Sequence, residues 1–459
     1  MINKALAERV LAAALSTGGD FAEIFLENSV SNNYSMIDGK IETVLSARAY
    51  GAGIRVLKGV QSVFASTNDL SEAGLMEVAR RIAAAVGRDH AQPDVALTES
   101  VTRNFSPILR TPSSIAIPRK LEVIKAAYAA AKDYSPEIRQ VSSRLLDKDS
   151  SVLVANSEGV FAADRRIRTR LVVSAVASDG VENQSGFSGP GRLTGFEMFD
   201  QVDPAAHGKI AAAMAVTMLH AQNCPAGKMP VAIENGFGGV IFHEACGHSL
   251  EATSVGKGNS EFCGKLGQRI ANEKVTAIDD GTVPNAWGSI NMDDEGMPSR
   301  RNVLIEKGVL KGYLIDKLGG RRMQMEPTGS SRRQSYEYAP TSRMTNTYID
   351  NGPDKNEDII RTMGDGLYAA SMGGGSVDPI TGEFNFAVAE GYLVRDGKIC
   401  EPVRGASLIG KGSEILLDID MVGQNLDVGQ GMCGSLSGSV PTNVGQPLIR
   451  VKSMTVGGR

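Results

Sequence analysis

Turn dipeptides that separate alternating apolar runs constrain the fold of this chain more than any other sequence feature. Asp38-Gly39 stands between YSMI and KIETVL, and Asp396-Gly397 interrupts VRDGKI. A two-residue Asp-Gly turn favours an antiparallel hairpin because both of its positions tolerate positive φ. Gly308 marks a similar turn within EKGVLKGYL. The sequence therefore predicts antiparallel strand pairs in both halves of the chain.

Apolar residues at helical spacing predict helices in the first half of the chain. One lies at the N-terminus and ends before Gly18-Gly19, and the others cover residues 71–86, 119–134 and 204–222. The character of the sequence changes at Cys224-Pro225-Ala226-Gly227, after which glycines and hairpin signals dominate. We therefore expect an α+β fold with a mixed N-terminal domain (1–223) and a mostly antiparallel β domain (224–459).

Composition excludes several classes of protein. The chain has 48 basic and 52 acidic residues among 459, so a nucleic-acid binder that relies on bulk positive charge is not expected. A hydrophobic content of 42% argues against intrinsic disorder. No apolar run approaches the roughly 20 residues that span a bilayer, so no membrane segment is expected. Five dilute cysteines form no disulfide framework, which predicts a reducing, cytoplasmic location.

The segment HEACGHSLE carries the strongest chemical signal. His243 and His248 are two of only five histidines, and Glu244 follows the first of them. Their spacing is H-E-x-x-x-H, so a regular α-helix would place the two imidazoles about 140° apart. A π-type turn would bring both onto one face, and Gly247 weakens the regular helix at this point. A regular α-helix over 239–250 would therefore exclude a two-histidine metal site.

The residues alone leave the nature of this site open. In one interpretation the two histidines are satisfied polar groups on different faces of a buried helix. In the other they bind zinc, and Glu244 takes a proton from metal-bound water and delivers it to the leaving amine. A catalytic zinc usually has three protein ligands. The candidates for the third are His90, His207, His220, Glu251 and Cys433, the last of which we expect in a glycine-flanked loop.

Other clusters have simpler interpretations. Cys246 could be a nucleophile, but packing within the helix is the favoured interpretation. Arg332-Arg333 and Arg343 are expected to form a solvated charge cluster rather than a carboxylate site, and DRRIRTR (164–170) a solvated strand face. Gly373-Gly374-Gly375 lacks the context of a phosphate loop and suits recognition of a peptide backbone better.

Four segments together make the chain recognisable. They are HEACGHSLEA, NTYIDNG, GGGSVDPITGEFNFAVAEGYLVRDGKI and DVGQGMCGSLSGSVPTNVGQP. On these motifs the chain resembles the TldD/PmbA family of zinc metallopeptidases, in its TldD branch. The resemblance implies that His243, His248 and Cys433 bind Zn²⁺ and that Glu244 is the general base. It also implies a heterodimer with a TldE/PmbA-like subunit, with a homodimer as the alternative, and an N-terminal domain that contributes to the substrate groove and to dimerisation.

We therefore predict a zinc-dependent peptidase that hydrolyses short or unfolded peptides. One rival is a non-catalytic peptide-binding or regulatory subunit with a structural metal, since some family members are described as modulators of DNA gyrase. A second rival is a cysteine hydrolase that uses Cys246 or Cys433. The roles of Cys246 and Glu251 are left open by the sequence.

Overall fold

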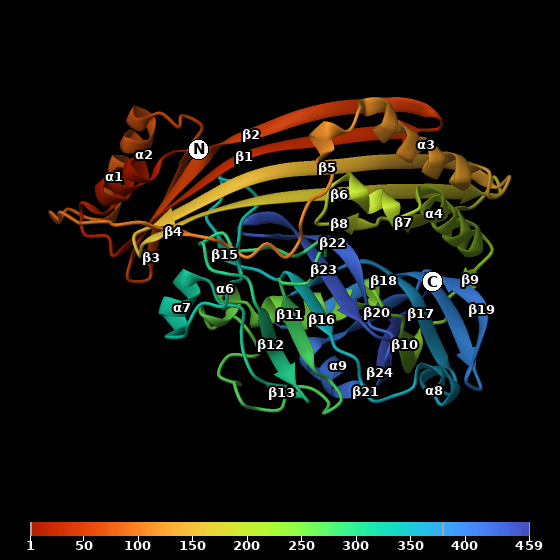
Figure 1. Ribbon diagram of the computed structural model, residues 1–459. Coiled ribbons are helices and arrows are strands. Elements are labelled where there is room, and N and C mark those ends of the chain that lie inside the picture. The colour runs from red at the N-terminus through yellow and green to blue at the C-terminus, as the bar shows by residue number, and fades with distance from the viewer. Residues whose placement is uncertain (1, 379–380, 459) are drawn as a thin grey trace.

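The computed structural model describes residues 2–378 and 381–458, and its N-terminal half is built around one long, bowed sheet (Figure 1). The strand order is β3-β2-β1-β5-β6-β4, with β7 and β8 also paired to β6. The predicted turn at Asp38-Gly39 joins β1 to β2, with φ of 47° and 81°. The strands are β1 (Phe21–Ile37), β2 (Lys40–Lys58), β3 (Gln61–Thr67), β4 (Thr98–Ser100), β5 (Ile138–Asn156), β6 (Val160–Ser178), β7 (Asn183–Ser188) and β8 (Gly191–Arg192).

Four helices cover one face of this sheet, close to the ranges predicted from periodicity. Side chains of β1 alternate between two faces, and Ala22, Ile24 and Leu26 pack against α1 and α2. Further along the same strand, Tyr34 and Met36 pack against α3 and α4. The helices are α1 (Lys4–Leu15), α2 (Glu72–Val86), α3 (Ile117–Lys132) and α4 (Pro204–Leu219), with short 3₁₀ turns η1 (Pro112–Ser114) and η2 (Phe196–Asp200).

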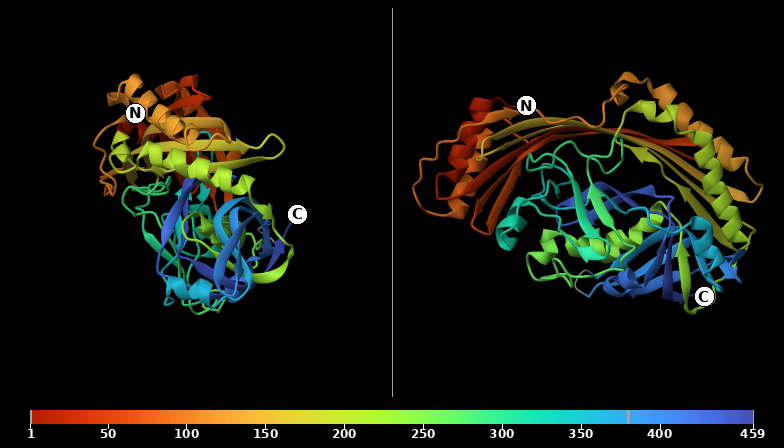
Figure 2. Two further views of the ribbon diagram at one scale, coloured as in Figure 1. Left: turned by 90° about the vertical axis from the view of Figure 1, so that its right-hand side faces the viewer. Right: turned by 60° about the horizontal axis from the view of Figure 1, so that its bottom comes forward.

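Two further sheets form the C-terminal half, and the long sheet bows over them (Figure 2). One has the order β17-β10-β24-β20-β18-β19-β9 with β21 beside β24, and the other has the order β13-β12-β11-β16-β23-β22. Their strands are β9 (Gln222–Asn223), β10 (Gly227–Ile233), β11 (Ala277–Asp280), β12 (Arg301–Glu306), β13 (Val309–Leu310), β16 (Asn346–Ile349), β17 (Gly366–Val377), β18 (Glu383–Arg395), β19 (Lys398–Arg404), β20 (Ser407–Lys411), β21 (Ile419–Val422), β22 (Asp427–Ser435), β23 (Gly438–Gln446) and β24 (Ile449–Gly457).

Most of these strands pair in antiparallel fashion, as the hairpin signals predicted. Three pairs are parallel: β10 with β17, β16 with β23, and β19 with β9. Outside residues 237–250, the other elements of this half are the two-stranded pair β14 (Ser331–Arg332) and β15 (Thr341–Ser342), and the short helices α6 (Ala252–Val255), α7 (Lys317–Met323), α8 (Asn356–Arg361) and α9 (Gly412–Asp418). The mixed α+β architecture matches the prediction, whereas the domain division after residue 223 remains a prediction.

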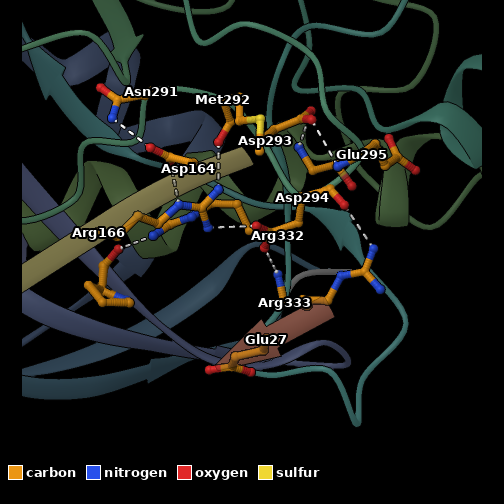
Figure 3. Close-up of polar contacts among 12 residues, drawn as sticks. Glu27, Asp164, Arg166, Asn291, Met292, Asp293, Asp294, Glu295, Arg332 and Arg333 are labelled. Carbon is orange, nitrogen blue, oxygen red and sulfur yellow. Dashed lines mark hydrogen bonds and ion pairs between the residues drawn. The ribbon is translucent and has the colours of Figure 1, made fainter. Parts of the chain in front are cut away.

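A buried polar layer joins the long sheet to the C-terminal half. On the face of the sheet without helices, Arg166 of β6 lies 2.7 Å from Asp294 and 2.9 Å from Asp164 (Figure 3). Arg333, from beyond β14, lies 2.7 Å from Glu23 of β1. We call this set the interface charge layer; its members are Glu23, Arg55, Asp164, Arg166, Asp293, Asp294, Glu295, Asp316 and Arg333.

No helix in the described ranges is both long and apolar enough to cross a bilayer.

Candidate metal centre

A π-helical turn brings the two histidines of H-E-x-x-x-H together, as the five-residue spacing predicted. The chain runs through η3 (Phe237–Gly239) and α5 (Val240–Phe242) into the π turn η4 (His243–Gly247), and then into η5 (His248–Leu250). The His248 N–H donates to the His243 carbonyl, which is the i→i+5 bond of a π turn. The ring centroids of the two imidazoles lie 5.1 Å apart. A regular α-helix, which would have excluded the site, is absent over these residues.

The two imidazoles converge on the thiol of Cys433. The Nε2 atoms of His243 and His248 each lie 3.2 Å from Cys433 Sγ. The three donor atoms all lie within 4.8 Å of one another. His243 and Cys433 are buried, and His248 is largely buried.

Cys433 lies on a strand rather than in the expected loop, so that part of the prediction was wrong. It belongs to β22 and pairs with Val440 of β23, and its side chain contacts both histidines. Register with a neighbouring strand overrides the low strand propensity of its flanking glycines. A rigid strand holds a ligand more precisely than a loop would.

Arg343 fixes the hairpin that carries Cys433. This fully buried side chain donates to the carbonyls of Cys433 and Gly438 and to the Ser437 hydroxyl. A guanidinium can satisfy several acceptors at once because its five N–H groups form a planar fork. No sequence signal indicates this positioning role, because Arg343 lies 90 residues from Cys433.

Close backbone approaches also hold the π turn in place. A Cβ at Gly247 would lie 2.3 Å from Met344 Sδ, and a Cβ at Gly412 would lie 2.2 Å from the Ala245 carbonyl oxygen. Real Cβ atoms do not come so close, so both positions need glycine unless the neighbours move. A side chain at Gly412 would meet backbone, whereas one at Gly247 would have to displace the end of the Met344 side chain.

The electrostatics of the centre suit a thiolate ligand. Burial opposes ionisation of Cys433, but the two neighbouring imidazoles outweigh it and lower the thiol pKa to about 3. Burial likewise disfavours the charged form of His248, yet Glu251 and Cys433 together raise its pKa well above the usual value. Glu251 Oε2 lies 3.1 Å from His248 Nδ1, which orients Nε2 toward the sulfur. One thiolate and two imidazoles are a donor set that suits zinc, and a carboxylate behind a histidine is a common supporting group.

Glu244 lies beside the donors without joining them. Its Oε2 is 3.7 Å from His248 Nε2, and 27% of its side chain is exposed. It can therefore face both the three donors and an incoming molecule. This is a suitable place for a proton carrier.

The structure separates the other candidate ligands from the site. His207 lies on α4 with Nδ1 2.8 Å from the Ser188 hydroxyl, and the exposed His220 contacts Glu137. His90 is exposed in a loop. Glu251 supports His248 and is not one of the three clustered donors.

Cys246 packs in the core as expected. It is 1% exposed, and burial raises its thiol pKa well above the usual value. Gly373–Gly375 lie within β17 rather than in a phosphate loop.

Two predictions about arginines were wrong. Arg332, Arg333 and Arg343 are buried rather than solvated, because they bridge β14, the β22–β23 hairpin and the long sheet. Within DRRIRTR, Arg168 is also buried and Arg166 is largely buried, since the segment 287–294 covers their face of β6. Alternation of charge located the strand but did not show that both of its faces are covered.

Comparisons with known proteins identify the family of the chain. The PmbA/TldA metallopeptidase family matches in three consecutive segments: domain 1 over 22–86, the central domain over 110–219 and the C-terminal domain over 226–458. A protein of Haemophilus influenzae named metalloprotease TldD homolog is 35% identical, over 96% of this chain and 93% of its own length. A metalloprotease of Methanothermobacter thermautotrophicus is 34% identical, over 96% of each chain. A protein of Saccharolobus solfataricus, 29% identical over 71% of this chain and 68% of its own, is named zinc metalloprotease TldD homolog.

Solved structures share the fold. A protein of Thermotoga maritima superposes with a TM-score of 0.82 at 21% identity, covering 99% of this chain and 100% of its own. TldE of Thermococcus kodakarensis superposes with a TM-score of 0.76 at 20% identity, covering 96% of this chain and 97% of its own.

Proposed function

The chain belongs to the PmbA/TldD family of metallopeptidases, and from this premise we propose that it is a zinc-dependent peptidase acting on short or unfolded peptides. One observation carries the proposal. The π turn aims both histidine Nε2 atoms at Cys433 Sγ, and Glu244 stands beside them.

His243, His248 and Cys433 would hold the zinc, and Glu244 would move the proton. Bound Zn²⁺ supplies Lewis-acid polarisation of the scissile carbonyl and lowers the pKa of a coordinated water. Glu244 accepts the proton of the attacking water and then donates it to the nitrogen of the leaving amine. Glu251 keeps the His248 ring oriented through Nδ1.

The strand next to the metal centre suits an extended peptide. β22 is the last strand of its sheet, and a Cβ at Gly434, directly after Cys433, would meet no atom of the described chain within 4 Å. An extended backbone can therefore approach the donors along this edge and pair with it. Recognition of backbone rather than side chains would select unfolded peptides over folded proteins.

The test combines metal analysis with peptide cleavage for the wild type and Glu244→Gln. We expect Glu244→Gln to retain zinc and to lose activity by about 100-fold to 10,000-fold, the usual contribution of general acid–base catalysis. The exposed Glu306→Gln is the matched control and should keep both properties. Full activity of zinc-loaded Glu244→Gln would exclude the proposed role.

The partner and the location follow as part of the same proposal. We propose assembly with a TldE/PmbA-like subunit, with a second copy of this chain as the alternative, and a cytoplasmic location. The five free cysteines suit a reducing compartment. The cleavage assay is therefore run on the chain alone and together with any co-purifying subunit.

Two rival functions give different results in the same assay. A regulatory subunit with a structural metal would bind zinc but cleave no peptide, either alone or with a co-purifying subunit. The set of three donors favours catalysis instead, because structural zinc usually has four ligands. A cysteine hydrolase is suggested by the Cys433–histidine contacts, since a thiolate beside imidazole is also a nucleophile. Chelator inhibition that added zinc reverses would exclude the cysteine mechanism.

A further inference from the structure

A cavity of about 480 Å³ lies between the long sheet and the C-terminal half, apart from the three clustered donors. Its volume is in the range of sites for small organic molecules, roughly 300–1,000 Å³. One wall is the sheet face without helices, and the other comes from the segment 287–294, β14 and the β22–β23 hairpin. Met432 lines it, and since neighbouring strand residues point to opposite faces, Cys433 points away from it.

Much of the cavity wall is apolar, which suits a ligand with an apolar body. The side chains that supply this surface include Phe25, Leu45, Leu146, Trp287, Ile290 and Met432. Leu45 lies on β2 opposite Asn33 of β1, and Asn33 lies opposite Leu146 of β5. One row of the sheet thus contributes both apolar surface and an amide to the cavity.

Each acidic residue that lines the cavity already has a basic partner. Glu27 lies 3.1 Å from Lys148, Asp147 lies 2.9 Å from Lys120, and Asp294 lies 2.7 Å from Arg166. None of these carboxylates forms an ion pair with the two remaining arginines of the cavity wall, although Asp294 acts on both electrostatically.

Arg168 and Arg332 line the same cavity but make no salt bridge with any described residue. Arg168 is about nine-tenths buried and donates to the carbonyls of Trp287 and Ser289, at 2.9 and 2.8 Å. Arg332 is 3% exposed and donates to the carbonyls of Met344 and Pro441, at 2.6 and 2.7 Å. A guanidinium has five N–H groups, so each arginine has donors to spare.

The environment disfavours these two positive charges. Burial, and then the charges of Arg332 and Arg166, lower the pKa of Arg168 to about 9. Burial is also the main cause that lowers the pKa of Arg332 to about 10. The nearby Asp294 offsets part of this cost at both arginines, and a bound anion would offset more of it.

The cavity also contains an amide oxygen without a donor. Asn33 Oδ1 is buried and has no hydrogen-bond partner among the residues that the structure describes. Arg168 lies on β6, two strands away from the strand of Asn33. It is displaced by two residues along β6 from the position in line with Asn33, which corresponds to about 12 Å between the Cα atoms of Arg168 and Asn33. A ligand of one or two residues can reach both groups.

We propose that this cavity binds a carboxylate that carries an apolar group and an N–H donor. The carboxylate pairs with Arg168 and Arg332, the N–H donates to Asn33 Oδ1, and the apolar group packs on Trp287. The C-terminal residue of a peptide presents this chemistry, and identifying the ligand as a peptide end rests on the proposed peptidase function. Binding itself requires neither zinc nor Glu244.

Trp287 provides the measurement, because it is the only tryptophan of the chain and lines the cavity. N-acetylphenylalanine and N-acetylphenylalanine amide are titrated into the full chain carrying Glu244→Gln, and isothermal calorimetry checks the fluorescence. We expect saturable binding of the acid and binding of the amide at least about tenfold weaker, the loss that follows from removing a charged hydrogen-bond partner. Phenylpropionate, which has the carboxylate but no N–H, should bind with intermediate affinity.

Two variants and a control locate the binding site. Arg332→Met should weaken binding of the acid by about tenfold, whereas Arg168→Lys, which keeps the charge, should weaken it less. Arg48→Met, on an exposed arginine of β2, should leave binding unchanged. Equal binding of acid and amide, no saturation by either, or full binding by Arg332→Met would overturn the proposal. Saturable binding of the acid by a zinc-loaded wild type that cleaves no peptide would contradict only the peptidase function.

Discussion

The metal centre and the interface charge layer both bury ionisable groups, but they do so in different ways. The metal centre gathers three donors at one point, and two of them come from a single π turn. The interface charge layer spreads opposite charges across the contact between the long sheet and the C-terminal half (Figure 3). In the first case the side chains converge on a position that a cation can fill. In the second they mostly satisfy one another.

This difference teaches what a buried charge indicates about function. Carboxylates and guanidiniums that pair with each other hold two parts of a protein in register and leave nothing for a ligand. Donor atoms that converge on one point, such as those around Cys433, can instead bind a cation. The cavity arginines, which form no ion pair with a described residue, can bind an anion. The following variants separate the two kinds of buried charge.

The largest effect is expected at the ligand that comes from the distant strand. Cys433→Ala removes the only thiolate of the donor set, so zinc content should fall from about one per chain to on the order of a tenth. Peptidase activity should fall by about 1,000-fold or more, since the Lewis acid is lost. Metal analysis and a cleavage assay measure both quantities.

Cys246→Ala is the matched control for this substitution. Cys246 lies within the π turn but only packs in the core. The Cys246→Ala variant should therefore keep its zinc and most of its peptidase activity. Equal loss of zinc in the two variants would mean that Cys433 is not a ligand.

An intermediate effect is expected from the carboxylate behind His248. Glu251→Gln keeps the size of the side chain but removes the charge that orients the imidazole. Zinc affinity should fall by about tenfold to 100-fold, as is usual for groups that support a metal ligand. Competition with a chromophoric chelator measures the affinity. Glu261→Gln, at a largely buried glutamate outside the donor set, is the control and should change zinc affinity little. Unchanged zinc affinity in Glu251→Gln would show that Glu251 does not support the His248 ligand.

The smallest effect is a pH dependence of stability that belongs to the interface charge layer. Burial and the nearby Glu295 raise the pKa of Asp316 to about 7, and the same two causes raise that of Asp293 to about 8. Both values exceed the value of about 3.9 in an unfolded chain, so the folded protein retains protons that the unfolded chain releases. The resulting stability is present at low pH and is lost as the pH rises through about 7 to 8.

Asp316→Asn tests this dependence without removing the helix cap. Asp316 accepts the Gly319 N–H at the start of α7, and asparagine caps a helix equally well. The wild type should lose on the order of a few °C more in Tm than Asp316→Asn between pH 5.5 and pH 8.5. Asp203→Asn, at the exposed cap of α4, should behave like the wild type. An identical dependence of Tm on pH for the wild type and Asp316→Asn would show that the pKa of Asp316 is not raised in the folded protein.

The sequence predicted local features well and distant ones poorly. The five-residue spacing of His243 and His248 was enough to predict a π turn, because helix geometry depends only on neighbours. Cys433 lies 185 residues from His248, and no spacing rule connects them. It was selected only by resemblance to a family, and its strand was mistaken for a loop.

The predictions that the arginine clusters are solvated were wrong for a related reason. Arg166 and Arg168 read as one face of a solvated strand, and alternation along a strand does not show what covers that face. Register across β1, β5 and β6, together with the segment 287–294, decides that Arg168 is buried and Arg166 largely buried. The same limit applies to Arg343, whose contacts with the β22–β23 hairpin depend entirely on tertiary structure.

X-ray absorption at the zinc edge tests the proposed His₂Cys centre most directly. The sample is the full chain reconstituted with one equivalent of zinc. The proposed ligands predict one sulfur at about 2.3 Å and nitrogen or oxygen ligands near 2.0–2.1 Å, with the outer-shell scattering of two imidazoles. The sulfur should disappear in any zinc that Cys433→Ala retains. A spectrum without sulfur, or one with two or more sulfurs, would contradict a centre built from His243, His248 and Cys433.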